Sequence, residues 1–147
     1  MSEASWNTQG LRAKAGIEPL HFLLGEWCGA GVCHGVRVTG VLTGVALLDG
    51  SWLQVTEVLR DESGTVVHED LSLYRFDVES DALQAVQIFE RGSMLSSLVE
   101  LCDDGFRWIT GPGAPQLRFT LCGPEVSYTV HLPDEDAPVV QMSYKPA

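Results

Sequence analysis

Residues 21–35, HFLLGEWCGAGVCHG, place a tryptophan, two cysteines and two histidines in a glycine-rich segment near the start of the chain. Side chains alternate between the two faces of a β-strand, so Trp27 and Cys33 share one face while Cys28 lies on the other. At about 3.3 Å per residue the two cysteines are roughly 16 Å apart, too far to bind one tetrahedral zinc ion. The segment therefore predicts a strand of a β-barrel, in which glycines let the sheet bend and leave space inside, and Trp27 closes one end.

The rest of the chain alternates short runs rich in Val, Leu, Thr and aromatic residues with turns of Gly, Pro, Asp and Ser, a pattern typical of strands. We predict ten strands, at residues 26–38, 40–48, 51–60, 65–77, 82–90, 93–103, 106–111, 116–122, 125–132 and 138–145. Only residues 16–25 look helical, with Pro19 near the helix start. Closing such a meander removes its exposed edges. The prediction is an all-β fold, a single ten-stranded antiparallel up-and-down β-barrel with a short N-terminal helix over residues 17–147, after a flexible segment over residues 1–16.

Composition limits the partners that this chain can have. Twenty acidic residues against nine basic ones give a net charge of −11, which repels nucleic acids and anionic membranes, so neither is expected as a partner. The first residues, MSEASWNTQGLRAKAG, lack the apolar core of a signal peptide, and no stretch is long enough to cross a membrane as a helix. We therefore expect a cytoplasmic protein with its four cysteines reduced, and leave open whether it forms a homodimer.

Two motifs resemble those of a known group of barrels. The segment EPLHFLLG followed by EWCGAG, residues 18–31, is similar to the Leu-Gly-x-Trp-x-Gly-x-Gly start of nitrobindin-type barrels, and VHEDLSLYR, residues 67–75, is similar to a His-to-Arg stretch on a central strand of that family. Nitrobindins belong to the calycin superfamily, together with lipocalins and fatty-acid-binding proteins. The resemblance implies a calycin-like barrel that holds a ligand.

The same resemblance argues against two familiar contents of such barrels. In nitrobindins a histidine in a Pro-His-Leu segment of the last strand binds haem iron, and Val139 stands at the corresponding position here. Fatty-acid-binding proteins hold a carboxylate with an Arg-x-Tyr pair on the final strand, whereas residues 142–144 keep only Tyr144. Haem is therefore disfavoured, and no cofactor is expected.

The register of a predicted hairpin determines which side chains point into the barrel. Residues 62–64, Glu-Ser-Gly, have the form of a three-residue loop with its glycine in the left-handed conformation, which pairs Asp61 with Thr65. Continuing this register places Glu57 opposite Glu69, on a face whose other members are apolar and which should therefore point inward. The β-carbons of such a pair lie about 5 Å apart. Repulsion between the two carboxylates should therefore raise the pKa of one of them. The pair is then a candidate general acid and base.

The same alternation extends the inward face to the next strand, where Arg91 would lie beside Glu69 as a ligand contact or as an internal ion pair. The residues expected to contact a ligand are Trp27, Leu53, Glu57, Glu69, Leu71, Leu73, Gln87, Phe89 and Arg91. A one-residue error in the register would move Glu69 to the outer face. On the predicted register, the alternating residues His68, Asp70, Ser72 and Tyr74 face solvent and form no catalytic group.

These observations favour a binding protein that holds a small hydrophobic or amphipathic molecule inside the barrel. One alternative is a small barrel enzyme, isomerase-like or cyclase-like, with Glu57 and Glu69 as acid and base. A haem-binding protein of the nitrobindin type is a second alternative, disfavoured by Val139. A barrel that acts only through its outer surface is a third.

Overall fold

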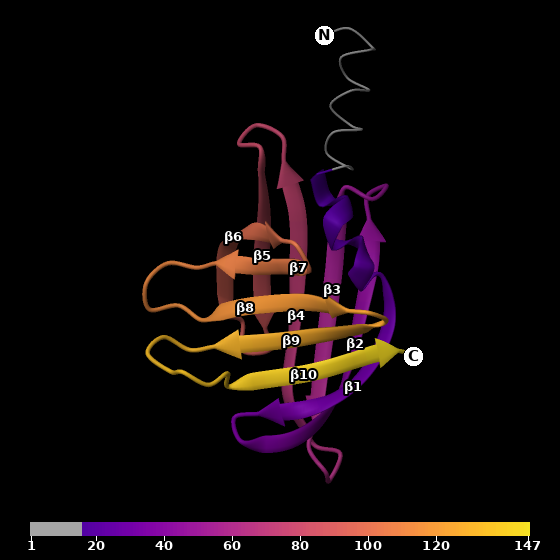
Figure 1. The fold of residues 1–147 in the computed structure, drawn as a ribbon, viewed down its shortest axis with the longest axis vertical. Coiled ribbons are helices and arrows are strands. Elements are labelled where there is room, and N and C mark those ends of the chain that lie inside the picture. Colours follow the sequence, from indigo (N-terminus) through magenta and orange to yellow (C-terminus); the bar gives the residue numbers. More distant parts are fainter. Residues whose placement is uncertain (1–15) are drawn as a thin grey trace, which may run out of the picture.

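The computed structural model describes residues 16–147, which form a closed barrel of ten antiparallel strands (Figure 1). The strands are β1 (Gly25–Cys33), β2 (Val36–Leu47), β3 (Trp52–Arg60), β4 (Val66–Asp77), β5 (Ala82–Phe89), β6 (Met94–Cys102), β7 (Gly105–Ile109), β8 (Gln116–Cys122), β9 (Glu125–His131) and β10 (Val140–Pro146). Each strand pairs with its neighbours in the chain, and β10 closes the barrel against β1. The predicted fold class is confirmed.

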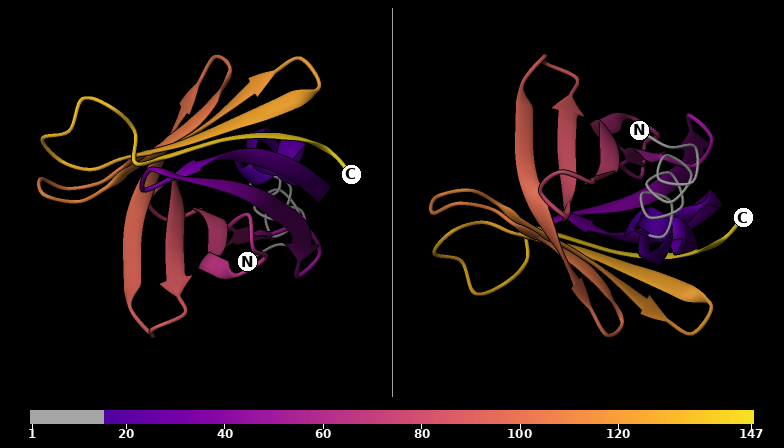
Figure 2. Two further views of the ribbon diagram at one scale, coloured as in Figure 1. Left: turned by 90° about the horizontal axis from the view of Figure 1, so that it is seen from below. Right: turned by 90° about the horizontal axis from the view of Figure 1, so that it is seen from above.

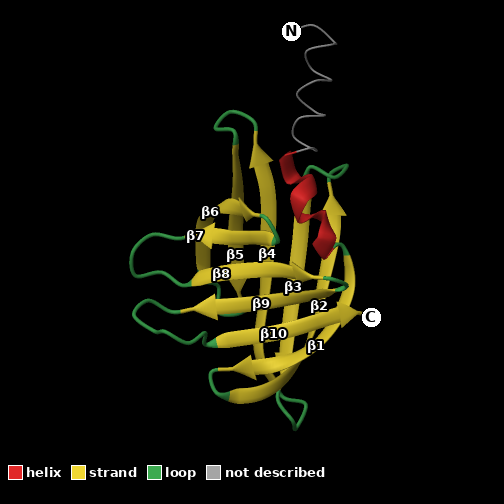
Figure 3. Cartoon of the chain, in the orientation of Figure 1, coloured by secondary structure: helices red, strands yellow, loops and turns green. Residues whose placement is uncertain are grey.

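The barrel is flattened, since β7 to β10 cross β2 to β5 at a steep angle (Figures 1 and 2). One end is covered by η1 (Glu18–Leu23), a 3-10 helix that contacts both β3 and β7 (Figure 3). Its Leu23 carbonyl accepts a hydrogen bond of 3.2 Å from the Trp27 indole. Trp27 thus closes this end, as predicted. Within residues 16–147 no helix is long and apolar enough to cross a membrane. The flexible segment predicted over residues 1–16 lies outside the described residues, apart from Gly16.

The first hairpin differs from the prediction. A strand over residues 26–38 was expected, but β1 ends at Cys33 and β2 begins at Val36. His34 and Gly35 have φ angles of 49° and 80°, and two successive positive φ angles define a type I′ turn, which matches the twist of the strands that it joins.

The hairpin between β3 and β4 follows the prediction at its tip and departs from it two residues later. The amide of Asp61 donates to the Thr65 carbonyl at 3.0 Å, and Gly64 has a φ of 86°. Arg60 then lies opposite Val66, but Leu59 lies opposite His68. Val67 is the extra residue of a β-bulge, and a shift of one residue reverses the two faces of a strand.

The bulge corrects the prediction for all of β4. Glu57 lies opposite Asp70 instead of Glu69. The side chains that point into the barrel are those of His68, Asp70, Ser72 and Tyr74, and those on the outer face are Glu69, Leu71 and Leu73. Gln87 and Phe89 on β5 point inward, as predicted, because Ser72 pairs with Gln87 and Asp70 with Phe89. Arg91 is exposed in the turn after β5 and does not meet Glu69.

The space that the glycines of β1 and β2 provide is filled by side chains of β10. A β-carbon on Gly29 would lie 2.7 Å from the Tyr144 ring, and one on Gly40 would lie 2.5 Å from the Tyr144 hydroxyl. A β-carbon on Gly31 would lie 2.8 Å from the Met142 sulfur. Such approaches are shorter than van der Waals contact, so these glycines allow Tyr144 and Met142 to reach the interior.

Candidate functional site

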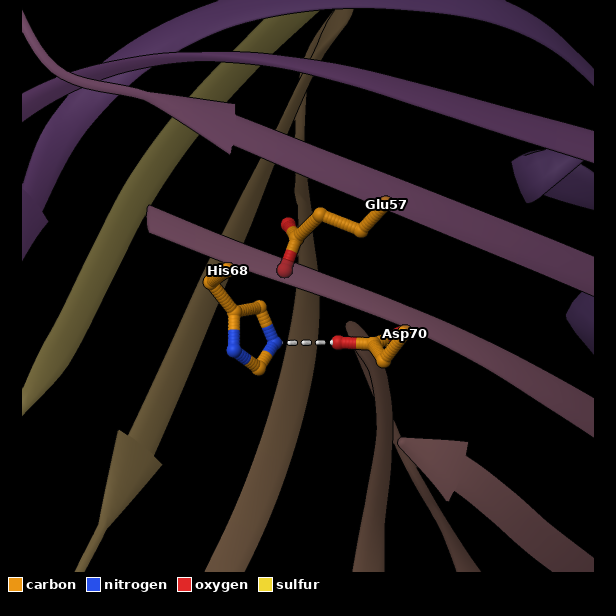
Figure 4. A group of neighbouring side chains, drawn as sticks. All are labelled: Glu57, His68 and Asp70. Atoms are coloured by element: carbon orange, nitrogen blue, oxygen red, sulfur yellow. Dashed lines mark hydrogen bonds and ion pairs between the residues drawn. The ribbon is translucent and has the colours of Figure 1, made fainter. Parts of the chain in front are cut away.

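Three polar side chains meet inside the barrel on the hairpin of β3 and β4. Glu57 is only 3% exposed and Asp70 only 6%, and the two face each other across the paired strands. His68 lies two residues before Asp70 on the same inward face, so its imidazole reaches the same place. Figure 4 shows the Glu57 carboxylate turned toward His68 and Asp70.

Hydrogen bonds hold all three groups, but one oxygen of Glu57 makes none. The His68 Nε2 and Asp70 Oδ2 atoms are 2.5 Å apart. The Tyr144 hydroxyl donates to Glu57 Oε2 at 2.5 Å, and Glu57 Oε1 is buried without a hydrogen-bond partner among the described residues. A buried oxygen without a partner is costly and is rare in folded proteins, so a ligand that supplied this partner would be stabilised here.

The electrostatics follow from burial. Loss of hydration, with a smaller contribution from the nearby Asp70 carboxylate, raises the pKa of Glu57 from 4.5 to about 8, against the opposing hydrogen bond from Tyr144. The hydrogen bond to Asp70 raises the pKa of His68 in spite of its partial burial. At neutral pH most copies of the protein therefore carry a neutral Glu57.

A cavity of about 150 Å³ opens at the end of the barrel opposite η1, and we call it the mouth pocket. Its walls are mainly apolar and include Phe89, Leu95, Leu117, Val130 and Val139. Two polar side chains on its lining belong to the inward face of β4 and β5: His68 and Gln87. The Gln87 amide donates to the Ser72 hydroxyl at 3.3 Å. The mouth pocket therefore ends at the polar cluster, with Glu57 and Asp70 behind it.

A larger groove of about 520 Å³ lies on the outer face of the barrel and is lined by Trp52, Leu73 and Arg75 among others. The Arg75 guanidinium stands 5.8 Å from the centre of the Trp52 ring. This groove contains none of the inward polar residues. Leu73, expected inside, belongs to it.

The predicted ligand-contacting residues thus divide into three groups. Gln87 and Phe89 line the mouth pocket, while Glu57 is buried behind it. Trp27 and Leu53 are buried but do not line the pocket. The residues that the structure places outside the barrel interior are Glu69, Leu71, Leu73 and Arg91. An acid–base pair of Glu57 with Glu69 is therefore wrong.

Sequence analysis missed His68, Asp70 and Ser72, although their signal was the polar alternation along residues 68–74. The contribution of Tyr144 to Glu57 was also missed, because nothing local links residues 87 positions apart. Val139 lines the mouth pocket close to where the resemblance would place a haem ligand, and its isopropyl group has no atom that can bind iron. Haem ligation of that type does not fit this position.

Comparison with protein-family models found no match, and comparison with curated proteins found none either. The class of the protein is therefore defined by its own structure. It is a closed ten-stranded antiparallel barrel, consistent with a calycin-like fold, with a polar cluster below a small apolar pocket.

Proposed function

We propose that this barrel binds a small amphipathic molecule in the mouth pocket, with the molecule's polar group against His68 and Gln87. The observation that carries the proposal is the shape of the interior. Aromatic side chains fill the end below η1, whereas the opposite end has an apolar cavity that finishes on polar side chains. Ligand sites in proteins commonly combine apolar walls with a few polar groups that orient the ligand.

The size of the pocket restricts the ligand class. A dry apolar cavity of about 150 Å³ holds a molecule the size of benzene, and the mouth pocket has the same volume. We therefore expect a ligand portion no larger than one six-membered ring, carrying a hydroxyl or a similar neutral group. A neutral group suits the site because the adjacent Glu57 is largely protonated at pH 7.

Methyl NMR spectroscopy tests this proposal with two probes of the same size, toluene and benzyl alcohol. Both should shift the methyl resonances of Leu117 and Val139, and benzyl alcohol should bind more tightly because its hydroxyl reaches Gln87 or His68. Gln87→Met keeps the length of the side chain and removes one of the two polar groups, so it should reduce the preference for the alcohol. Gln84→Met, on the outward face of the same strand, should leave the preference unchanged.

A second pair of variants tests the location. Val139→Trp should fill the mouth pocket and prevent binding of both probes, whereas Val32→Trp, at an exposed position of β1, should have no effect. The proposal is wrong if neither probe shifts the Leu117 and Val139 methyl groups, or if binding persists in Val139→Trp.

Closer kinship with nitrobindins or fatty-acid-binding proteins forms part of this proposal. Its support is the Leu24-Gly25-x-Trp27 motif at the start of β1, together with a barrel of the expected strand number. The cytoplasmic location, and the exclusion of nucleic acid and membrane as partners, stay predictions from charge and sequence.

A further inference from the structure

We propose that Glu57, His68 and Asp70 form a binding site for a divalent transition-metal ion such as zinc. The three residues offer one imidazole nitrogen and two carboxylate oxygens, a set of donors that suits first-row transition metals. This inference goes beyond the proposed ligand binding, and it does not require a molecule in the mouth pocket.

The geometry brings the donor atoms together before any ion is bound. The ligand atoms of the three residues all lie within 4.8 Å of one another. Donors about 2.0–2.2 Å from a tetrahedral zinc ion are roughly 3.4 Å apart, so shifts of about 1 Å in the side chains suffice. Glu57 and Asp70 are held opposite each other by strand pairing, and the bulge at Val67 turns His68 to the same face.

A second observation points to a ligand at this place. Glu57 is 97% buried, and its Oε1 atom has no hydrogen-bond partner among the described residues, while Oε2 is already held by Tyr144. The carboxylate is turned toward the imidazole and the second carboxylate (Figure 4). A cation between the three groups would displace the proton of Glu57, supply the missing partner of Oε1 and compensate two buried carboxylates with one divalent charge.

The surroundings resemble those of a catalytic metal site more than those of a structural one. Three protein ligands leave a fourth position free, which is typical of sites that bind water or substrate. His68 lines the mouth pocket, so an ion beside it has a route to solvent. The Tyr144 hydroxyl orients the Glu57 carboxylate from behind, as residues around metal ligands commonly do.

Metal binding is tested with full-length protein freed of metal by a chelator and dialysed. Isothermal titration with zinc chloride should show one ion bound per chain. Cobalt chloride should give the visible absorption bands of a four- or five-coordinate ion. The near-ultraviolet band of a cobalt–thiolate bond should be absent, because none of the three proposed ligands is a cysteine.

Variants locate the ion. Glu57→Gln and His68→Asn should each lower the affinity by more than about 100-fold, and Tyr144→Phe should lower it by about 10–100-fold. Glu69→Gln removes a carboxylate from the outer face, next to both His68 and Asp70 in the chain, and should leave the affinity unchanged. Near-ultraviolet circular dichroism shows whether each variant keeps the packed barrel.

Either of two outcomes of the affinity measurements would overturn the inference: a wild-type protein that binds no ion, which requires no variant to interpret, or binding that persists in both Glu57→Gln and His68→Asn. A thiolate band in the cobalt spectrum would assign the ion to a cysteine and would also overturn it. Repeating the toluene and benzyl alcohol titrations with chelator present separates this inference from the proposed function, since ring binding should survive metal removal.

Discussion

The two ends of the barrel interior are built from the same strands but differ in how their polar atoms are hydrogen-bonded. Below η1, the Trp108 indole donates to the Tyr74 hydroxyl at 3.2 Å, and both side chains are fully buried among aromatic rings. At the opposite end, His68 and Gln87 line a cavity, and Glu57 behind them has one oxygen without a hydrogen-bond partner within residues 16–147. At the closed end Trp108 and Tyr74 satisfy each other, although His21 Nε2 in η1 is also buried without a hydrogen-bond partner among the described residues. At the open end, the unpartnered Glu57 oxygen lies behind a cavity that can admit a ligand.

Strand β4 shows this difference within one segment. Tyr74, toward the closed end, contacts Trp108 and Phe106 edge-on, with ring centres 6.2 and 5.5 Å away. Six residues earlier His68 is half-buried beside the mouth pocket. One strand therefore contributes to the stability of the barrel at one end and to its chemistry at the other, and substitutions along it should separate the two roles.

The largest effect should come from Trp108→Ala at the closed end. Removing a fully buried indole leaves a cavity and deprives Tyr74 of a donor, so the free energy of unfolding should fall by about 3–5 kcal/mol. Trp52→Ala is the matched control, because Trp52 is only half-buried on the outer face, and it should cost about 1 kcal/mol. Urea unfolding monitored by circular dichroism measures both, and similar costs would contradict the contrast.

The pH dependence of stability should come from the open end. Glu57 has a pKa of about 8 in the folded protein against its ordinary value of 4.5, so the folded chain holds an extra proton between these values. The stabilisation is complete below about pH 4.5 and is lost as the pH rises through 8, by on the order of a few kcal/mol. The raised pKa of His68 acts in the same direction above its ordinary value of 6.5.

Urea unfolding of metal-free protein between pH 5 and 9 checks this prediction. The groups that face Glu57 are Asp70 and His68 on β4, Tyr144 on β10 and Cys33 on β1. Glu57→Gln should flatten most of the slope, and Glu69→Gln should preserve it. A slope that Glu57→Gln does not change would assign the pH dependence to another group.

An intermediate effect is expected for Gly40→Ala. The added β-carbon would lie 2.5 Å from the Tyr144 hydroxyl and 2.8 Å from Leu59, so the ring must move, at a cost of about 1–3 kcal/mol. The displacement should also break the bond to Glu57 and lower the affinity for zinc. Gly50→Ala is less suitable as a control because its φ is positive; Gly111→Ala meets no atom within 4 Å and should be neutral in both assays.

The smallest effect should be the coupling between Tyr144 and Glu57. A double-mutant cycle with Tyr144→Phe and Glu57→Met, which keeps the side-chain length and removes the acceptor, isolates this pair, and a buried hydrogen bond to a carboxyl group should give a coupling of about 1–2 kcal/mol. Denaturation at pH 6, where Glu57 is neutral, supplies the four free energies. Additive single effects would show that the short contact contributes nothing to stability.

The sequence was sufficient for features that depend on neighbouring residues. Turn signals and alternation located ten strands, and residues 61–65 form the predicted loop. The error arose at Val67, because a bulge depends on how two strands pack over their whole length and has no residue signature there. Two leucines lie on the outer face of β4, and their apolar side chains made this face resemble an inner face. The polar residues from His68 to Tyr74 made the true inner face resemble a solvent-exposed one.

The candidate site was predictable only in part for a related reason. Glu57 and Gln87 were placed inside by alternation within their own strands. The partner of Glu57 is Tyr144, on the last strand, and its path to the interior depends on Gly29 and Gly40 in the first two strands. Contacts of this kind depend on closure of the barrel, which no single segment encodes.

The bulge at Val67 decides which face of β4 lines the interior. If Val67 were paired with Leu59 without a bulge, the same sequence would turn Leu71 and Leu73 inward and leave the imidazole and the Asp70 carboxylate on the surface. Deletion of residue 67, by contrast, would remove the bulge and keep Leu59 opposite His68, so the polar interior would be preserved. One extra residue in a single strand pairing thus separates a polar interior from an apolar one.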